Sequence, residues 1–360
     1  MSSEQGYGIT GIQQVGIGVS DLPDAWKWYA EHLGFDVPAF DDAAQAPFMT
    51  RYTGGSVQSR RAALAINMNG GGGFEVWQYT SRTPTPPPRP PHLGDYGILL
   101  VRLKAPDVDA AYRALREAGT ALLSQPVTDP AGRKHFLLRD PRGNAFQIIE
   151  APEGERWLAR RPGRVGGVAG VMIGTPDIEA TLPLYRDILG YDRMTYDETG
   201  SFADLTGLPG GNWRVRRVLL EHTQPRRGGF SPLLGKTAVE LVQALDERGV
   251  PIFENRYWGD LGFIHVCFEV QGLGALKEAC REAGLEFTVD SGQSFDMGKA
   301  AGRFAYVEDA AGTLVEFVET HKVPVLPALG INVSLGKGER GKTVPRWLLK
   351  LMGLKRRRTL

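Results

Sequence analysis

The 360-residue sequence has few cysteines, no long apolar run and almost no net charge. Its two cysteines, Cys267 and Cys280, do not favour a disulfide scaffold, and they fit a reducing compartment. No stretch of about 18 apolar residues suggests a membrane span. The first residues, MSSEQGYGIT, lack the basic and apolar regions of a signal peptide. These absences favour a cytoplasmic location.

The net charge of +1 is unevenly distributed along the chain. Residues 322–360 carry ten Lys or Arg and one acid, Glu339, for a net charge of +9, so −8 remains on residues 1–321. An acidic body does not favour nucleic-acid binding, and we expect a small-molecule substrate instead. At roughly 100–200 residues per domain, the length predicts about two domains.

Four segments of the first half of the chain recur in the second half, in the same order and at nearly constant offset. The pairs are WYAEHLGFDV (28–37) with LYRDILGYDR (184–193), FEVWQY (74–79) with VELVQA (239–244), LGDYGILLVRL (93–103) with WGDLGFIHVCF (258–268), and DPRGNAFQIIEAP (140–152) with DAAGTLVEFVETH (309–321). Because chance similarity does not keep order and offset, the chain contains an internal repeat.

Each half divides again into two modules. Every module opens with a strand of alternating apolar residues, near residues 10, 97, 167 and 262. An amphipathic helix follows, and short strands with Gly-rich turns close the module. In the second module Gly119 marks the end of the helix. The order βαβββ, four times over, predicts an α+β protein in which helices cover one face of a sheet.

This pattern resembles the vicinal oxygen chelate superfamily, which includes glyoxalase I, methylmalonyl-CoA epimerase, extradiol dioxygenases and bleomycin-resistance proteins. The LGF and ILGY turns and the closing strands DPRGNAFQI and DAAGTLVEF carry the resemblance, which covers residues 7–321. It implies two fused glyoxalase-like domains, at residues 7–152 and 165–322, followed by a basic tail at 323–360. The fold carries many chemistries, so the resemblance says less about the reaction.

Alternation along a strand separates residues beneath the helices from residues on the open face. In FIHVCFEV, the covered set is predicted to be Ile264, Val266, Phe268 and Val270. The open set is then His265, Cys267 and Glu269. The same reasoning places further polar residues on open faces, namely Gln14, Glu75, Gln147, Glu240 and Glu316.

The resemblance implies that one divalent ion is held by open-face residues from the first and last strands of the modules. The second half offers a good set of ligands, Glu240, His265 and Glu316. The fourth position, or corner, of this set is vacant, because it is Gly170. The first half offers a poorer set, which we expect to be degenerate: Gln14, Glu75, Gln147 and Leu100. We therefore place the ion, one of Mn, Fe, Zn, Ni or Co, in the second half.

A structural alternative needs no metal. Three imidazole or carboxylate groups on a closed face are costly when unpaired. An arginine such as Arg216, Arg256 or Arg303 would neutralise them as an ion-pair network.

An ion held by Glu240, His265 and Glu316 predicts Lewis-acid and enolate chemistry on a small carbonyl compound, by an isomerase, epimerase or lyase. A carboxylate beside the metal is a candidate general base, with Glu316 preferred over Glu240. An iron dioxygenase is a second possibility, although Gly170 stands where the resemblance expects a histidine. A non-enzymatic binding or resistance protein is a third.

Weaker substrate-site candidates are Gly170, Cys267, Arg303, Gln14 and Glu75. In the tail, VPRWLLKLMGLKRRRTL predicts a short amphipathic helix with its apolar side at Trp347, Leu348, Leu351 and Leu354. This helix either docks onto the body or touches a partner or an anionic membrane surface. We expect a monomer or a homodimer.

Overall fold

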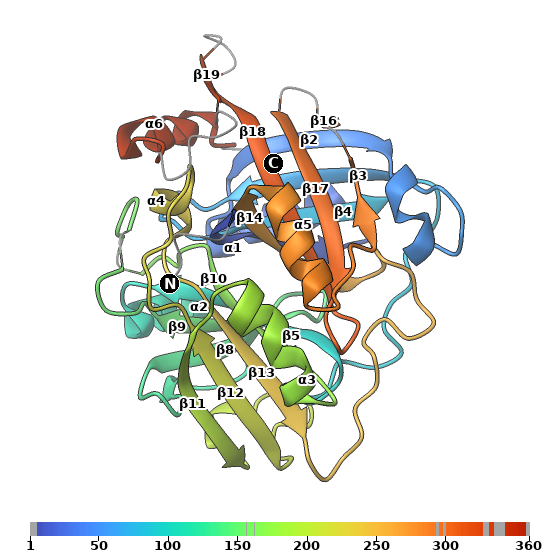
Figure 1. The fold of residues 1–360 in the computed structure, drawn as a ribbon. Helices are drawn as coiled ribbons and strands as arrows, with labels where there is room; N and C mark the ends of the chain where they lie inside the picture. Colours follow the sequence, from blue (N-terminus) through green and yellow to red (C-terminus); the bar gives the residue numbers. More distant parts are fainter. Residues whose placement is uncertain are drawn as a thin grey trace.

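The computed structural model describes residues 6–155, 157–161, 163–292, 295–297, 300–326, 331–334 and 343–357. Its strands form two curled sheets, and helices pack against both of them (Figure 1). The predicted α+β class with four βαβββ modules is confirmed. None of the helices in the described residues is long and apolar enough to cross a membrane.

Sheet A lies in the upper part of Figure 1 and follows the order β15-β17-β18-β14-β1-β4-β3-β2, with β16 beside β17 and β19 beside β18. Its strands are β1 (Gly8–Gly18), β2 (Val37–Gln45), β3 (Ser59–Ile66), β4 (Gly73–Tyr79), β14 (Gly262–Gln271), β15 (Val289–Asp290), β16 (Phe295–Met297), β17 (Ala300–Glu308), β18 (Leu314–Leu326) and β19 (Ile331–Ser334).

Sheet B lies below it and follows the order β11-β12-β13-β10-β5-β9-β8-β6, with β7 beside β8. Its strands are β5 (Gly97–Ala105), β6 (Ala121–Leu122), β7 (Val127–Thr128), β8 (Lys134–Arg139), β9 (Ala145–Glu150), β10 (Val168–Gly174), β11 (Arg193–Gly200), β12 (Val215–Glu221) and β13 (Ala238–Ala244).

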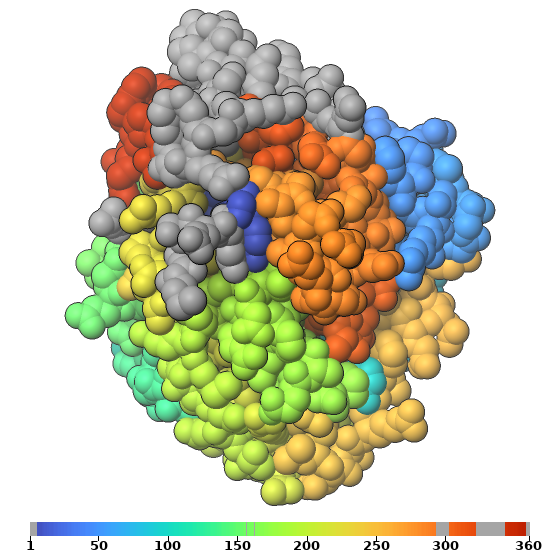
Figure 2. Space-filling view, in the orientation of Figure 1, coloured from blue at the N-terminus to red at the C-terminus, as the bar shows by residue number. Residues whose placement is uncertain are grey.

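Each sheet therefore combines one module from each half of the chain. The first module pairs with the fourth in sheet A, and the second pairs with the third in sheet B. The modules are joined by two antiparallel strand pairs, β1 with β14 and β10 with β5. Figure 2 shows the same division on the surface, with residues of the fourth module beside those of the first and the third module below them. Any site in one sheet is thus built by both halves.

One helix follows the first strand of each module, and N-terminal caps explain where three of these four helices start. They are α1 (Leu22–Leu33), α2 (Val108–Glu117), α3 (Ile178–Pro183), which continues as the π-helical turn η2 (Leu184–Ile188), and α5 (Leu273–Glu282). Asp21, Asp107 and Asp177 precede the first three, and each carboxylate accepts a hydrogen bond from a backbone N–H of the first turn. Shorter helical segments are η1 (Pro47–Tyr52), η3 (Ala203–Leu205), α4 (Ser231–Leu234), α6 (Arg346–Leu351) and η5 (Met352–Lys355).

Most of the predicted covered residues lie in the main core between the sheets and these helices. Val266, Phe268 and Val270 are fully buried there. Ile264 is the exception, because it packs on the opposite side with Trp77 and Tyr306. The register of β1 against β14 shifts at this point, and a β-bulge reverses the alternation of side chains.

The described part of the C-terminal tail packs against the body. Leu349 and Met352 are buried, whereas Trp347 and Leu354 are 66% and 71% exposed. The predicted apolar side is therefore confirmed for Leu348 and Leu351, which pack against the apolar cluster that contains Leu349 and Met352, and is wrong for Trp347 and Leu354, whose places are taken by Leu349 and Met352. In Figure 1, α6 lies beside α4.

Candidate metal centre

Four polar side chains converge on the open face of sheet A, one from each of its four central strands. They are Gln14 on β1, Glu75 on β4, His265 on β14 and Glu316 on β18. His265 Nε2 lies 3.2 Å from Glu75 Oε2 and 3.2 Å from Glu316 Oε2. Gln14 Nε2 donates hydrogen bonds to the same two oxygens, at 3.2 and 3.4 Å. Three ligand atoms, one each from Glu75, His265 and Glu316, all lie within 4.8 Å of one another.

Strand register explains this convergence. Gly16 on β1 is the partner of Glu75 on one side and of His265 on the other, and Cys267 is the partner of Glu316. Gly16 also makes room for the imidazole, because a Cβ atom there would lie 2.4 Å from His265 Cε1 and 2.7 Å from its Nδ1. This role of Gly16 was not predicted from the sequence, although a glycine within a strand is a signal of close approach.

The residues present fit a divalent ion. All four are buried, and His265 is completely so. Among the described residues, Gln14 Oε1 and His265 Nδ1 have no hydrogen-bond partner, and His265 Nε2 has only its contacts with the two carboxylates. No Lys or Arg pairs with Glu75 or Glu316 in the described part of the chain. Two buried carboxylates, an imidazole and an amide oxygen are a donor set that a cation would satisfy.

The pKa of His265 reflects the negative charge of this site. Burial lowers the pKa of His265, but the adjacent carboxylates of Glu316 and Glu75 outweigh it and raise the pKa to about 9. In the metal-free protein the imidazole is therefore protonated at neutral pH and balances part of that charge. A divalent ion held by these residues would supply that positive charge in place of the proton.

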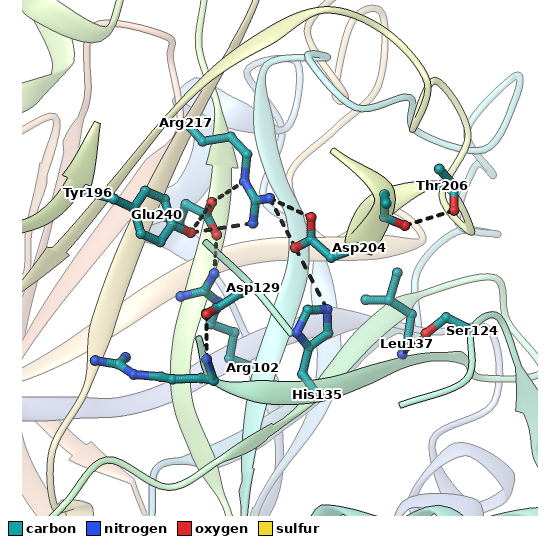
Figure 3. A network of polar contacts seen from close by, with 12 residues as sticks. Arg102, Ser124, Asp129, His135, Leu137, Tyr196, Asp204, Thr206, Arg217 and Glu240 are labelled. Carbon is teal, nitrogen blue, oxygen red and sulfur yellow. Dashed lines mark hydrogen bonds and ion pairs between the residues drawn. The ribbon is translucent and has the colours of Figure 1, made fainter. Parts of the chain in front are cut away.

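Glu240, the third predicted ligand, lies in sheet B, so its expected grouping with His265 and Glu316 is wrong. Its carboxylate pairs with two arginines and a tyrosine (Figure 3). Arg217 Nε donates to Glu240 Oε1 at 2.6 Å, Tyr196 donates to the same oxygen at 2.7 Å, and Arg102 pairs with Oε2. Burial raises the pKa of Glu240, but Arg217 and Arg102 outweigh burial and lower it.

Register shows that Glu240 occupies the position in sheet B that Glu75 occupies in sheet A. The corners of sheet B that correspond to Gln14, Glu75, His265 and Glu316 are Gly170, Glu240, Leu100 and Gln147. Arg102 corresponds to Cys267, and its guanidinium supplies the positive charge. The predicted arginine network therefore exists in sheet B, but Arg102 and Arg217 form it rather than Arg216, Arg256 or Arg303.

The weaker candidates for the substrate site are also divided between the two sheets. Gly170 lies in sheet B, where a Cβ atom would be 2.3 Å from the Ala238 carbonyl oxygen. Cys267 shares the open face of sheet A, but burial raises its thiol pKa well above the usual value, so it stays protonated. Arg303 on β17 lines the same pocket as Glu75 and Glu316, and its guanidinium pairs with Asp290 at 3.8 Å. Gln14 and Glu75 thus join the site, and Gly170 does not.

A pocket opens directly above the four converging residues. Gln14, Glu75 and Glu316 form part of its lining, together with Gln13 and Thr320. Its remaining walls are mainly apolar, and they include residues from α4 and η5 that the sequence analysis did not connect with the site. A small molecule in this pocket would reach the carboxylates, while His265 stays buried beneath them.

Comparisons with known proteins agree with this architecture. The family model described as Glyoxalase/Bleomycin resistance protein/Dioxygenase superfamily matches residues 11–148 and 167–317. The structure resembles glyoxalase I from Zea mays, with 15% identity, a TM-score of 0.51, and coverage of 86% of this chain and 92% of that one. It also resembles a putative dioxygenase from Bacillus subtilis, with 12% identity, a TM-score of 0.52, and coverage of 87% and 86%.

A search of curated proteins finds no match. At these identities the solved structures speak for the fold alone, whereas the family model matches most of the chain in both halves. The chain therefore belongs to the glyoxalase/bleomycin resistance protein/dioxygenase superfamily.

Proposed function

We propose that the protein is a metal-dependent isomerase, epimerase or lyase that acts on a small carbonyl-containing substrate. Its ion would be held by Gln14, Glu75, His265 and Glu316. The observation that carries this proposal is the convergence of these four buried side chains, with unsatisfied donor atoms, at the floor of one pocket.

A divalent ion bound there would polarise a carbonyl oxygen as a Lewis acid. Proton transfer then falls to the chain's own carboxylates. Glu316 and Glu75 line the pocket and can reach a carbon next to the carbonyl, whereas Glu240 is excluded by its place in sheet B. We assign the base to Glu316, which lines the pocket and would take the proton from the α-carbon and return it to the product, so that no other group has to accept it. His265 and Gln14 orient the site.

The donor set favours this reaction class over an iron dioxygenase. Non-haem iron oxygenases commonly use two histidines and one carboxylate. The four residues that converge here include one histidine, two carboxylates and one amide. The dioxygenase hypothesis assigned its first histidine to Gly170, and the corresponding position in sheet A holds Gln14 rather than a histidine.

The experiment is metal analysis by plasma mass spectrometry of protein purified without chelator. We expect near-stoichiometric Mn, Zn, Ni, Co or Fe in the wild type, and a loss of at least tenfold in His265→Ala, Glu75→Ala and Glu316→Ala. Gln147→Ala is the matched control, because Gln147 occupies the equivalent corner of sheet B and its amide atoms have no partner. Equal metal loss in this control, or no metal in any protein after incubation with divalent ions, would refute the proposed site.

The assignment of the base is tested separately. The metal-loaded enzyme is incubated in D₂O with a panel of α-hydroxycarbonyl and 2-substituted acyl compounds, and NMR follows deuterium entering the α-carbon. We expect exchange for at least one compound with the wild type, and a reduction of 10²-fold or more in Glu316→Gln that keeps its metal. Undiminished exchange in that variant would move the role to Glu75.

A further inference from the structure

The C-terminal segment, residues 343–357, lies beyond the family match, which ends at residue 317. We propose that this segment forms the outer wall of the metal pocket and selects carbonyl substrates that carry an apolar arm. The inference deepens the proposed function and rests on it.

The segment is held in place at both of its ends. Near its start, the Val344 backbone N–H donates to Gly229 O at 2.8 Å. Near its end, Arg356 and Arg357 form ion pairs of 2.8 and 2.9 Å with Asp36 and Asp41. The Arg357 guanidinium also lies 4.3 Å from the centre of the Trp26 ring. These contacts fix the segment against α1, β2 and the loop before α4.

The same segment reaches the pocket itself. Met352 is 2% exposed and belongs to the pocket lining. It packs in an apolar cluster whose other members include four residues that also line the pocket, Ile66, Phe230, Leu233 and Leu234. The apolar wall of the pocket is thus continuous with the surface on which the segment is docked.

The pocket has two chemically different ends. Its floor carries Gln14, Glu75 and Glu316, where chelating oxygens would bind. Its walls are mainly apolar and include Phe40, Leu64 and Phe304 in addition to the cluster, with Arg303 as the one cationic side chain among the described residues of the lining. A substrate that fits both ends has vicinal or carbonyl oxygens at one end and an aliphatic or aromatic arm at the other.

The volume of the pocket limits the size of the apolar arm that a substrate can carry. The pocket measures about 130 Å³, and an apolar cavity of about 150 Å³ accepts benzene. An arm of roughly six carbon atoms would therefore fill this space, part of whose lining is Met352.

The test uses the Co²⁺-loaded full-length protein and a series of straight-chain hydroxamic acids from two to ten carbons, whose two oxygens chelate the metal. Binding is followed by the change in the cobalt absorption spectrum. We expect affinity to rise about fourfold per methylene and to level off near six or seven carbons. Met352→Ala should move this plateau to chains longer by about two carbons, and the milder Met352→Val should move it in the same direction.

Met68→Ala is the matched control, because Met68 belongs to the same cluster and packs near Gly353 but is not part of the pocket lining. We expect its plateau to equal that of the wild type. Thermal unfolding checks that all three variants are folded. An unchanged plateau in both Met352 variants, or affinity independent of chain length, would overturn the inference while leaving the metal site intact. Failure of acetohydroxamate itself to bind the loaded protein would overturn the proposed function as well.

Discussion

Glu269 is a buried acid on the strand that also carries His265. It is 2% exposed, and its carboxyl group accepts hydrogen bonds from Thr320 Oγ1 at 2.8 Å and from Gln13. Burial raises its pKa from 4.5 to about 8, although the bonds from Thr320 and Gln13 act in the opposite direction. The folded, metal-free protein therefore keeps a proton at neutral pH that the unfolded chain has released.

This proton makes stability depend on pH with a defined sign. Between pH 4.5 and about 8 the folded state binds one more proton, so the contribution is full below 4.5 and is lost as pH rises through 8. Glu269→Gln, which is neutral at every pH, should remove this dependence. We expect the free energy of unfolding of the wild type to fall by up to about 1.4 kcal/mol more per pH unit than that of the variant. Denaturant titrations with chelator at pH 6, 7 and 8 measure it, and parallel curves would contradict it.

At the scale of strands, a buried ion-pair network occupies the open face of sheet B. The guanidinium of Arg102 is completely buried, and so is the carboxylate of Glu240 with which it pairs. Arg217 links the same carboxylate to Asp204 through hydrogen bonds of 2.9 and 3.0 Å (Figure 3). These charges hold β5, β12 and β13 together across the open face.

Removing one member of this network should therefore be costly. Arg102→Leu leaves the buried Glu240 with one arginine instead of two, and we expect a loss of about 3–5 kcal/mol in the free energy of unfolding. Arg216→Leu is the control. Its side chain pairs with the partly exposed Asp197 and Glu179, and its removal should cost about 1 kcal/mol or less. Metal content should stay unchanged in both variants. A small effect of Arg102→Leu in chemical denaturation would show that the network contributes little to stability.

At the scale of the whole molecule, the metal centre joins the two halves of the chain. Gln14 and Glu75 come from the first half, and His265 and Glu316 come from the second. An ion bound there would therefore stabilise the association of β1 with β14 rather than one half alone.

Both halves should respond to the ion as one unit. At a free metal concentration about 100-fold above Kd, we expect about 2.7 kcal/mol of added stability, in a single calorimetric transition that chelator shifts to lower temperature. His265→Ala should unfold at the same temperature with and without metal. Two transitions, of which the ion shifts only one, would be incompatible with a site shared between the halves.

The sequence by itself determined the local features of this protein. Alternation with a period of two identified the covered residues Val266 and Phe268 and the open-face residues His265 and Glu316, because neighbouring side chains of a strand point to opposite faces. The ordered repeats identified the modules. These patterns depend on a few consecutive residues, so they are readable without knowledge of the fold.

Tertiary structure alone decided which modules share a sheet, and hence which open faces form one site. The first strands of the four modules have similar sequence patterns, so no local sequence feature selects β14 rather than β5 as the neighbour of β1. That choice placed Glu75, instead of Glu240, beside His265. The bulge at Ile264 and the docking of Met352 against the pocket are likewise non-local, because each depends on a partner far away along the chain.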